Sequence, residues 1–277
     1  MAAESGARFG RYRIVRRIGD GSSGSVHLAV DDASGQALAL KTLPLADDDA
    51  RQRFHAETQA LARLEHPDIV SVLDAGQTPH TGWLAMELLA GCDLRRYTRT
   101  ARLLPEPLVL TLGARLALAL AHAHGRGVVH RDLKPSNVMV DWAAGRVTLT
   151  DFGLARLDDA AQTKSGIVAG SPDYMAPELL AGGAADARSD VYALGVLLFE
   201  LLSGRRPHVA DSLGRLLHLV ASAPAPDLRS LRPELPAPLA VLLAAMLGRR
   251  PAERPADLQA LAAQLHEVAA VVAAAPR

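Results

Sequence analysis

Residues 11–88 alternate between apolar and polar positions in short stretches that turn residues separate. A period of two residues is typical of half-buried β-strands. The expected strands are residues 12–18, 26–30, 37–43, 69–73 and 83–88. A helical pattern interrupts them at residues 50–64, where Asp47 to Asp49 can cap and charge the first turn. This part of the chain is predicted to form an antiparallel five-stranded sheet with one helix.

After Gly91 the apolar positions recur at the spacing of amphipathic helices. The expected helices are residues 108–124, 191–202, 213–221, 238–247 and 256–272. Residues 128–178 combine short strands with polar loops, and such a long stretch is more typical of function than of packing. The predicted fold class is therefore α+β, with a sheet-rich first part and a mainly helical second part.

The charge of the chain is balanced, with 30 Lys and Arg residues against 30 Asp and Glu residues in 277. This balance favours neither intrinsic disorder nor a broadly basic surface, so no nucleic-acid partner is expected. The single cysteine, Cys92, cannot form an internal disulfide, and the first residues lack the apolar stretch of a signal peptide, so we expect a cytoplasmic location. The apolar runs at 110–123 and 191–202 are interrupted and too short to cross a bilayer, so no membrane segment is expected.

Only three basic residues are lysines, Lys41, Lys134 and Lys164, in a chain otherwise supplied with arginine. Lys41 lies in an otherwise apolar predicted strand, where burying an ammonium is costly unless it is paired. Glu57 lies on the apolar side of the next predicted helix and can be that partner, although it can equally be a solvated helix carboxylate. Paired in this way, Lys41 would be held ready for phosphate oxygens.

The turn between the first two predicted strands is rich in glycine, and residues 19–26 read Gly-Asp-Gly-Ser-Ser-Gly-Ser-Val. Such a pattern also describes an ordinary hairpin. A dinucleotide-binding fingerprint requires a helix directly after the glycines, whereas residues 26–30 continue as a strand. The pattern therefore indicates a flap whose backbone amides can approach phosphates.

Four further motifs follow in a fixed order. Residues 130–132 read His-Arg-Asp, Asn137 follows, residues 151–153 read Asp-Phe-Gly, and residues 176–178 read Ala-Pro-Glu. Together with the glycine-rich turn and Lys41, they make the chain resemble the bacterial eukaryotic-like (Hanks-type) serine/threonine protein kinases.

This resemblance covers residues 9–270 and implies the two-lobed protein-kinase fold. The N-lobe would be residues 9–87, with an antiparallel five-stranded sheet and one helix, and a hinge at 87–91 would lead to a mainly helical C-lobe at 91–270. Residues 271–277 are expected to form a frayed tail.

The resemblance implies transfer of the γ-phosphoryl group of ATP to Ser or Thr hydroxyls of protein substrates, with Mg²⁺, or Mn²⁺ in its place, as the metal. Asp132 would be the catalytic base, Lys134 would neutralise the transferring group, and Asn137 and Asp151 would bind the metal. Lys41 would contact phosphates, oriented by Glu57. The implied nucleotide-binding residues are Ile18, Gly19, Asp20, Gly21, Ser22, Ser23, Gly24, Ser25, Val26, Ala39, Lys41, Met86, Glu87, Leu89 and Met139.

The family also implies structural and regulatory roles. Ser171, Glu178 and Arg254 would build the platform for a peptide substrate, with an ion pair between the last two. Ser171 would hydrogen-bond Asp132 and Lys134. Thr163 and Ser165 are the candidate autophosphorylation sites, because Arg131 beside the catalytic base can grip a phosphate. A regulatory spine would stack four side chains above Asp190: Leu61, Val72, His130 and Phe152.

Two other functions stay open at this point. One is a nucleotide-binding, pseudokinase-like signalling scaffold, and the other is a small-molecule kinase, which the Ala-Pro-Glu segment disfavours. A metal site built from His122, His124 and His130 is not favoured, because no cysteine or carboxylate joins them at ligand spacing.

Overall fold

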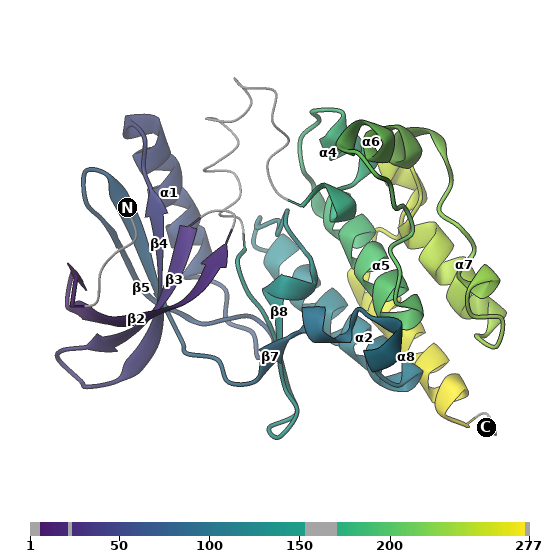
Figure 1. Ribbon diagram of the computed structural model, residues 1–277, viewed down its shortest axis with the longest axis horizontal. Coiled ribbons are helices and arrows are strands. Elements are labelled where there is room, and N and C mark those ends of the chain that lie inside the picture. Colours follow the sequence, from purple (N-terminus) through teal and green to yellow (C-terminus); the bar gives the residue numbers. More distant parts are fainter. Residues whose placement is uncertain (1–5, 22–23, 153–170, 275–277) are drawn as a thin grey trace. The chain divides into compact units, whose positions relative to one another are not determined.

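The computed structural model describes residues 6–21, 24–152 and 171–274, and it shows two compact units (Figure 1). The first unit contains the chain as far as Ala90, together with Phe152. The second unit contains Gly91–Asp151 and the chain from Ser171 onward. The division between Ala90 and Gly91 lies inside the segment that the sequence assigns to the hinge.

The first unit is an antiparallel sheet of six strands with the order β1-β2-β3-β4-β6-β5. Its strands are β1 (Arg8–Phe9), β2 (Tyr12–Gly21), β3 (Gly24–Asp31), β4 (Ala37–Pro44), β5 (Val72–Gln77) and β6 (Thr81–Met86). The five-strand prediction is wrong by one, because the two-residue β1 is too short to show a period in the sequence.

The strand predicted at 69–73 is also displaced, since β5 begins only at Val72. Ile69 and Val70 are buried, but they lie outside this strand. A turn precedes it, in which the Ile69 N–H donates to the carbonyl of His66 at 3.1 Å. The apolar residues Ile69 and Val70 lie in a buried turn, and their pattern was therefore mistaken for the start of a strand.

Helix α1 (Asp48–Leu61) packs against β5 and β6. Its N-cap is Asp47, whose carboxylate accepts a hydrogen bond from the Ala50 N–H at 2.7 Å, as the sequence predicts. The helix ends at Leu61 rather than at the predicted residue 64. Leu64 is nevertheless buried, in a turn closed by the hydrogen bond from its N–H to the Leu61 carbonyl.

The two faces of the sheet have different roles. One face carries a buried apolar cluster that consists of Tyr12, Ile14, Ala29, Leu38, Leu40, Trp83 and Ala85. Residues of the opposite alternation, Ala39 and Lys41, point to the other face. Across the strands Ala39 pairs with Met86, and Lys41 pairs with Val26 and Leu84. The predicted nucleotide-binding residues of β3, β4 and β6 thus share one face.

The second unit is mainly helical. Its helices are α2 (Glu106–His124), α4 (Pro177–Leu180), α5 (Ala187–Ser203), α6 (Leu213–Ser222), α7 (Ala237–Met246) and α8 (Leu258–Ala274). Short 3₁₀ turns connect them: η1 (Leu94–Tyr97), η2 (Thr100–Arg102), η3 (Pro135–Asn137), η4 (Pro172–Tyr174), η5 (Leu228–Ser230) and η6 (Pro251–Glu253). A small sheet has the strand order β7-β8-β9, formed by β7 (Cys92–Asp93), β8 (Val138–Asp141) and β9 (Arg146–Leu149).

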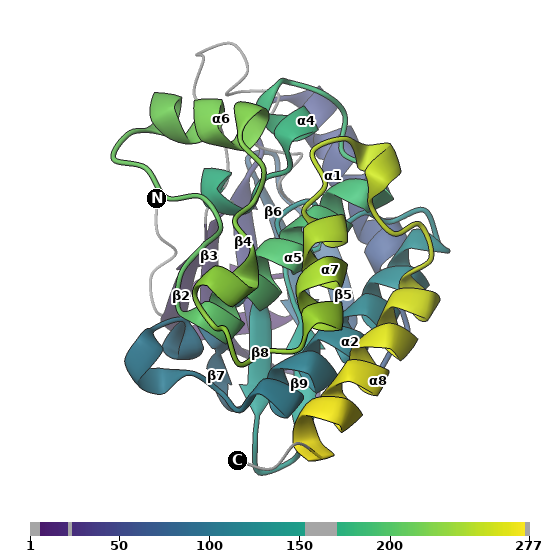
Figure 2. The same ribbon diagram turned by 90° about the vertical axis from the view of Figure 1, so that its right-hand side faces the viewer.

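Helix α5 forms the buried centre of this unit, since Ser189 to Ser203 are all buried. Its first turn is closed by a capping box between Asp186 and Ser189, and its last turn ends at Gly204 with a φ of 75°. Helices α2 and α8 lie side by side (Figure 2). Because α8 continues to Ala274, the tail predicted to fray from residue 271 is helical over its first four residues.

Among the described residues, α2 is the one helix that is long and apolar enough to cross a membrane. Most of its apolar residues are buried in the second unit, where α2 packs against both α5 and α8. A core helix of this kind passes the same length and hydropathy test as a membrane span.

Candidate active site

Asp190 of α5 fixes the backbone of the segment that carries the His-Arg-Asp motif. Its buried carboxylate accepts the N–H of His130 at 2.8 Å and the N–H of Arg131 at 2.9 Å. The Nε2 atom of His124 donates to the same carboxylate at 2.7 Å. Arg131 adopts a φ of 69°, a left-handed conformation that side chains disfavour. Asp190 thus anchors His130, one of the four predicted spine residues, while the stacking of the spine stays a prediction.

His130 is buried and acts as a structural residue. Its Nε2 atom lies 2.9 Å from the carbonyl oxygen of Thr150, which can only accept, so Nε2 carries the proton. Its Nδ1 atom then accepts the N–H of Asp132 at 3.3 Å. Burial lowers the pKa of His130, although neighbouring carboxylates oppose this shift. The neutral imidazole therefore connects the loop of Asp132 to the end of β9.

Asp132, Lys134 and Ser171 form a polar triad in the second unit. The Nζ atom of Lys134 donates to Oδ2 of Asp132 at 2.6 Å and to Oγ of Ser171 at 2.9 Å. The side chains of Asp132 and Lys134 are 12% and 14% exposed, so solvent can still reach both. The predicted contact of Ser171 with Lys134 is confirmed, and Lys134 connects Ser171 to Asp132. The Asp132 carboxylate, which can accept a proton, is therefore in direct contact with the Lys134 ammonium, which can attract phosphate oxygens.

Two hydrogen bonds join Asn137 to Thr150, the residue before Asp151. The carbonyl of Asn137 accepts both the N–H of Thr150 at 2.9 Å and its Oγ1 hydroxyl at 3.2 Å, which places the next residue, Asp151, beside Asn137. The Asn137 amide nitrogen donates to the carbonyl of Asp132 at 2.8 Å, and this orients its side chain. Asp151 has a φ of 63°.

An amide oxygen and a carboxylate at this position fit a hard divalent cation. Among the described residues there is no group of three or more His, Cys, Asp and Glu side chains that could hold a metal alone. A cation bound by Asn137 and Asp151 would have to complete its coordination with oxygens from water or from phosphate groups.

In the first unit, β2 and β3 pair as far as Gly21 and Gly24. Gly24 has a φ of 149°, and a Cβ atom there would lie 2.0 Å from the carbonyl oxygen of Thr42. The position therefore requires glycine because β4 approaches closely, a reason that the sequence alone does not reveal. Within β2, Arg17 forms an ion pair with Asp20, and across the hairpin it donates to Ser25 Oγ at 2.9 Å.

Lys41 is almost completely buried, with 2% of the residue exposed, and it stands beside Val26 in the strand register. Met86 and Ala39 are buried in neighbouring strands. Glu57 lies on α1 among buried residues of the same face. The interaction between Lys41 and Glu57 stays a prediction.

The segment after Met86 is fixed by two hydrogen bonds to Ser71. The N–H of Glu87 donates to the Ser71 carbonyl at 3.0 Å, and the Ser71 N–H donates to Oε1 of Glu87 at 2.9 Å. Because the Glu87 N–H is engaged, an adenine bound here would have to use the Glu87 carbonyl. The roles of Ile18 and Leu89 stay predictions, as does that of Met139, which lies in β8 of the second unit.

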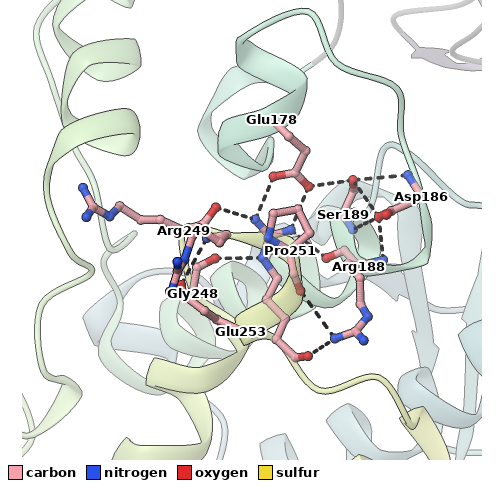
Figure 3. Close-up of polar contacts among 10 residues, drawn as sticks. Glu178, Asp186, Arg188, Ser189, Gly248, Arg249, Pro251 and Glu253 are labelled. Atoms are coloured by element: carbon pink, nitrogen blue, oxygen red, sulfur yellow. Dashed lines mark hydrogen bonds and ion pairs between the residues drawn. The ribbon is translucent and has the colours of Figure 1, made fainter.

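The predicted ion pair between Glu178 and Arg254 is present and buried. Both terminal nitrogens of Arg254 donate to the Glu178 carboxylate, each at 2.7 Å. The remaining N–H groups donate to the carbonyls of Gly248, Arg188 and Arg249. Figure 3 shows Glu178 facing the segment that contains Gly248 and Arg249, with Ser189 beside it. Burial raises the pKa of Glu178, but the hydrogen bonds from Arg254 and Ser189 outweigh burial and lower it.

Several predicted residues lie outside the described part of the chain. These are Ser22 and Ser23 of the glycine-rich turn, Gly153, and the candidate phosphorylation sites Thr163 and Ser165.

Residues 12–266 match the family described as protein kinase domain. The chain belongs to the protein kinase family. The match covers the motifs of both units, from the glycine-rich turn to Arg254. The predicted membership in the protein kinase family and the predicted two-lobed fold class are confirmed. Members of this family use ATP and a divalent metal ion.

Curated bacterial kinases are similar to this kinase domain. It is 42% identical to the DNA damage-responsive serine/threonine-protein kinase RqkA of Deinococcus radiodurans, over 91% of this chain and 39% of the relative. It is 38% identical to the serine/threonine-protein kinase Pkn1 of Myxococcus xanthus, over 92% of this chain and 38% of the relative. It is 34% identical to the serine/threonine-protein kinase PknL of Mycobacterium tuberculosis, over 96% of this chain and 67% of the relative. The chain thus spans about two fifths of the length of the first two.

Sequence reasoning missed a second polar cluster of the kinase domain, next to the Ala-Pro-Glu segment. The hydroxyl of Tyr174 donates to Oε2 of Glu200 at 2.5 Å, and Asp173 forms an ion pair with Arg206. Burial raises the pKa values of both Tyr174 and Glu200. A carboxylate inside the apolar run at 191–202 was the available signal, because a buried charge requires a partner.

Proposed function

We propose that this kinase domain transfers the γ-phosphoryl group of ATP to Ser or Thr hydroxyls of proteins. The observation that carries the proposal is the contact of Lys134 with both Asp132 and Ser171. It puts a proton acceptor and a cation at the position where an acceptor hydroxyl must meet a phosphoryl group. The names of the relatives, all serine/threonine-protein kinases, support Ser and Thr over Tyr.

The proposed reaction is a single in-line displacement. The acceptor oxygen forms a bond to the γ-phosphorus, and the bond from that phosphorus to the oxygen bridging it to the β-phosphorus breaks, which releases ADP. The proton of the hydroxyl passes to the Asp132 carboxylate. Lys134 stabilises the negative charge on the transferring group, and this interaction strengthens as the transition state forms.

We assign Mg²⁺ as the metal of this reaction, with Mn²⁺ as a substitute. Its binding residues would be Asn137 and Asp151, because a small hard cation prefers oxygen ligands and shares its coordination with phosphates. Bound there, the metal would supply charge neutralisation to the phosphate groups. In the first unit, the residues proposed to bind the nucleotide are the glycine-rich turn, Lys41 and the segment after Met86.

Transfer of labelled γ-phosphate to a generic protein substrate tests this function. Asp132→Asn should reduce the rate by about 10²- to 10⁴-fold, because the general base is lost. Asp211→Asn, which makes the same change at an exposed carboxylate of the second unit, should not. Equal rates for wild type and Asp132→Asn would refute the proposal and support the signalling scaffold instead. Phospho-amino-acid analysis of the product distinguishes Ser and Thr from Tyr.

We also propose that the domain phosphorylates itself on Thr163 or Ser165 and acts in the cytoplasm. Arg131, held by Asp190 next to Asp132, is the group that would bind the resulting phosphate. Mass spectrometry of wild type and Asp132→Asn after incubation with ATP tests the first part, since phosphate at these residues should require Asp132. Fractionation of the source cells tests the second part.

A further inference from the structure

A chain of contacts leads away from the polar triad across the surface of the second unit. Lys134 contacts Ser171, and two residues further along, Asp173 forms an ion pair with Arg206. Arg206 follows Gly204 and Arg205 in the turn after α5. This path connects the acceptor site to the C-terminal end of α5.

The turn at Gly204 in turn packs against η2. A Cβ atom at Gly204 would lie 2.8 Å from both the backbone nitrogen and the Oγ1 atom of Thr100. Thr100 and Arg205 also line one surface cavity of about 1210 Å³. Arg99 adjoins Thr100, and the N–H of Arg102 donates to the Arg99 carbonyl at 2.7 Å. Arg99 and Arg102 flank the segment that approaches Gly204, and Arg205 follows Gly204, so these three arginines lie on two neighbouring backbone segments; we call them the basic cluster.

The carboxylates around this basic cluster are already engaged. Asp93 binds Arg95, Asp173 binds Arg206, and Glu106 binds Arg232. The side chains of the basic cluster are exposed, and none of the three has a carboxylate partner among the described residues. In a chain without net charge, this leaves a local surplus of positive charge near the peptide platform.

We infer that this basic cluster selects protein substrates with Asp or Glu residues close to the acceptor Ser or Thr. An arginine side chain can bind a carboxylate through two parallel N–H groups, which matches an acidic side chain better than an apolar or basic one. An extended peptide advances about 3.3 Å per residue, so acidic residues a few positions from the acceptor can follow the path to the basic cluster. The inference rests on the proposed phosphotransfer and specifies its substrate class.

Three synthetic peptides with the same acceptor serine test this inference. One has neutral flanks, one has acidic residues before the serine, and one has them after it. For wild type, kcat/KM for one acidic peptide should exceed the neutral value by roughly three- to tenfold, as expected for a few exposed ion pairs. High salt should reduce this preference, because exposed charges are screened.

The charge reversals Arg99→Glu and Arg205→Glu should each reduce the ratio of acidic to neutral kcat/KM, and together they should invert it. Arg126→Glu reverses an exposed arginine of the second unit that lies just after the C-terminal end of α2 and does not line the cavity, and it should keep the wild-type ratio. Equal kcat/KM for all three peptides, or an equal effect of Arg126→Glu, would overturn the inference while phosphotransfer itself stands. If no peptide and no generic protein is phosphorylated, the proposed function fails and the inference falls with it.

Discussion

Replacement of Arg254 by Met should lower the free energy of unfolding of the second unit far more than an ordinary surface substitution does. The Arg254 side chain is 0% exposed, and its five N–H groups donate to Glu178 and to three backbone carbonyls. Methionine fills similar volume but donates nothing. The Glu178 carboxylate then stays largely buried, at 19% exposure, without its cation.

The expected cost is about 3–5 kcal/mol in the free energy of unfolding, the range for removing one partner of a buried ion pair. Arg254→Lys keeps the charge but has three donors instead of five, so it should cost about half as much. The double variant Glu178→Leu/Arg254→Met should lose less than the sum of the two single changes, because neither charge is then left alone.

The chain offers a convenient signal for this measurement. It has two tryptophans, Trp83 in the first unit and Trp142 in the second. In a Trp83→Phe background, the fluorescence of Trp142, which donates to Tyr97 at 2.6 Å, reports the urea unfolding of the second unit.

Arg250→Met is the matched control for this experiment. Arg250 lies four residues away in an exposed ion pair with Glu253 at 2.6 Å, and its loss should cost less than about 1 kcal/mol. A similarly small cost for Arg254→Met, or strict additivity in the double variant, would refute the reasoning.

Three further predictions concern other parts of the molecule. Gly24→Ala should raise KM for ATP and lower the stability of the first unit, because the new methyl group meets the Thr42 carbonyl; an unchanged KM would contradict the close approach. Asp190→Asn should lower kcat and cost about 2 kcal/mol in unfolding assays, since an amide cannot accept all three of its hydrogen bonds; wild-type kcat would argue against anchoring. The pKa of Glu178 lies below its ordinary 4.5. Its contribution to the stability of the fold is therefore complete above pH 4.5 and is lost as the pH falls through the folded-state pKa. Below pH 4.5 the free energy of unfolding of Arg254→Met should depend less steeply on pH than that of wild type, and equal slopes would contradict this.

Much of the site could be predicted from the sequence, because its chemistry depends on a few residue types at fixed spacing. The contacts of Lys134 with Ser171, of Arg254 with Glu178 and of Asp190 with the His-Arg-Asp segment all follow the motifs. Each of these residues contacts a specific partner, so a sequence that contains the motif also predicts the contact.

The errors in the predicted strands and helices arose where residues are buried but lie outside regular secondary structure. Ile69 and Leu64 are buried in turns, so their apolar character was mistaken for a strand and for a further turn of helix. The small residues after Val271 continue a helix that was expected to fray. The contact of Tyr174 with Glu200 was missed because both lie within segments that the pattern assigned to other roles.

The backbone at Arg131 and Asp151 implies a compromise between durability and activity. Among the described residues these are the two non-glycine positions with positive φ, and each such conformation costs on the order of 1 kcal/mol. Selection for stability alone would favour glycine at both. That a guanidinium and a carboxylate are kept there indicates that their chemistry outweighs the strain, so replacements that stabilise the domain at these two positions would do so at the expense of turnover.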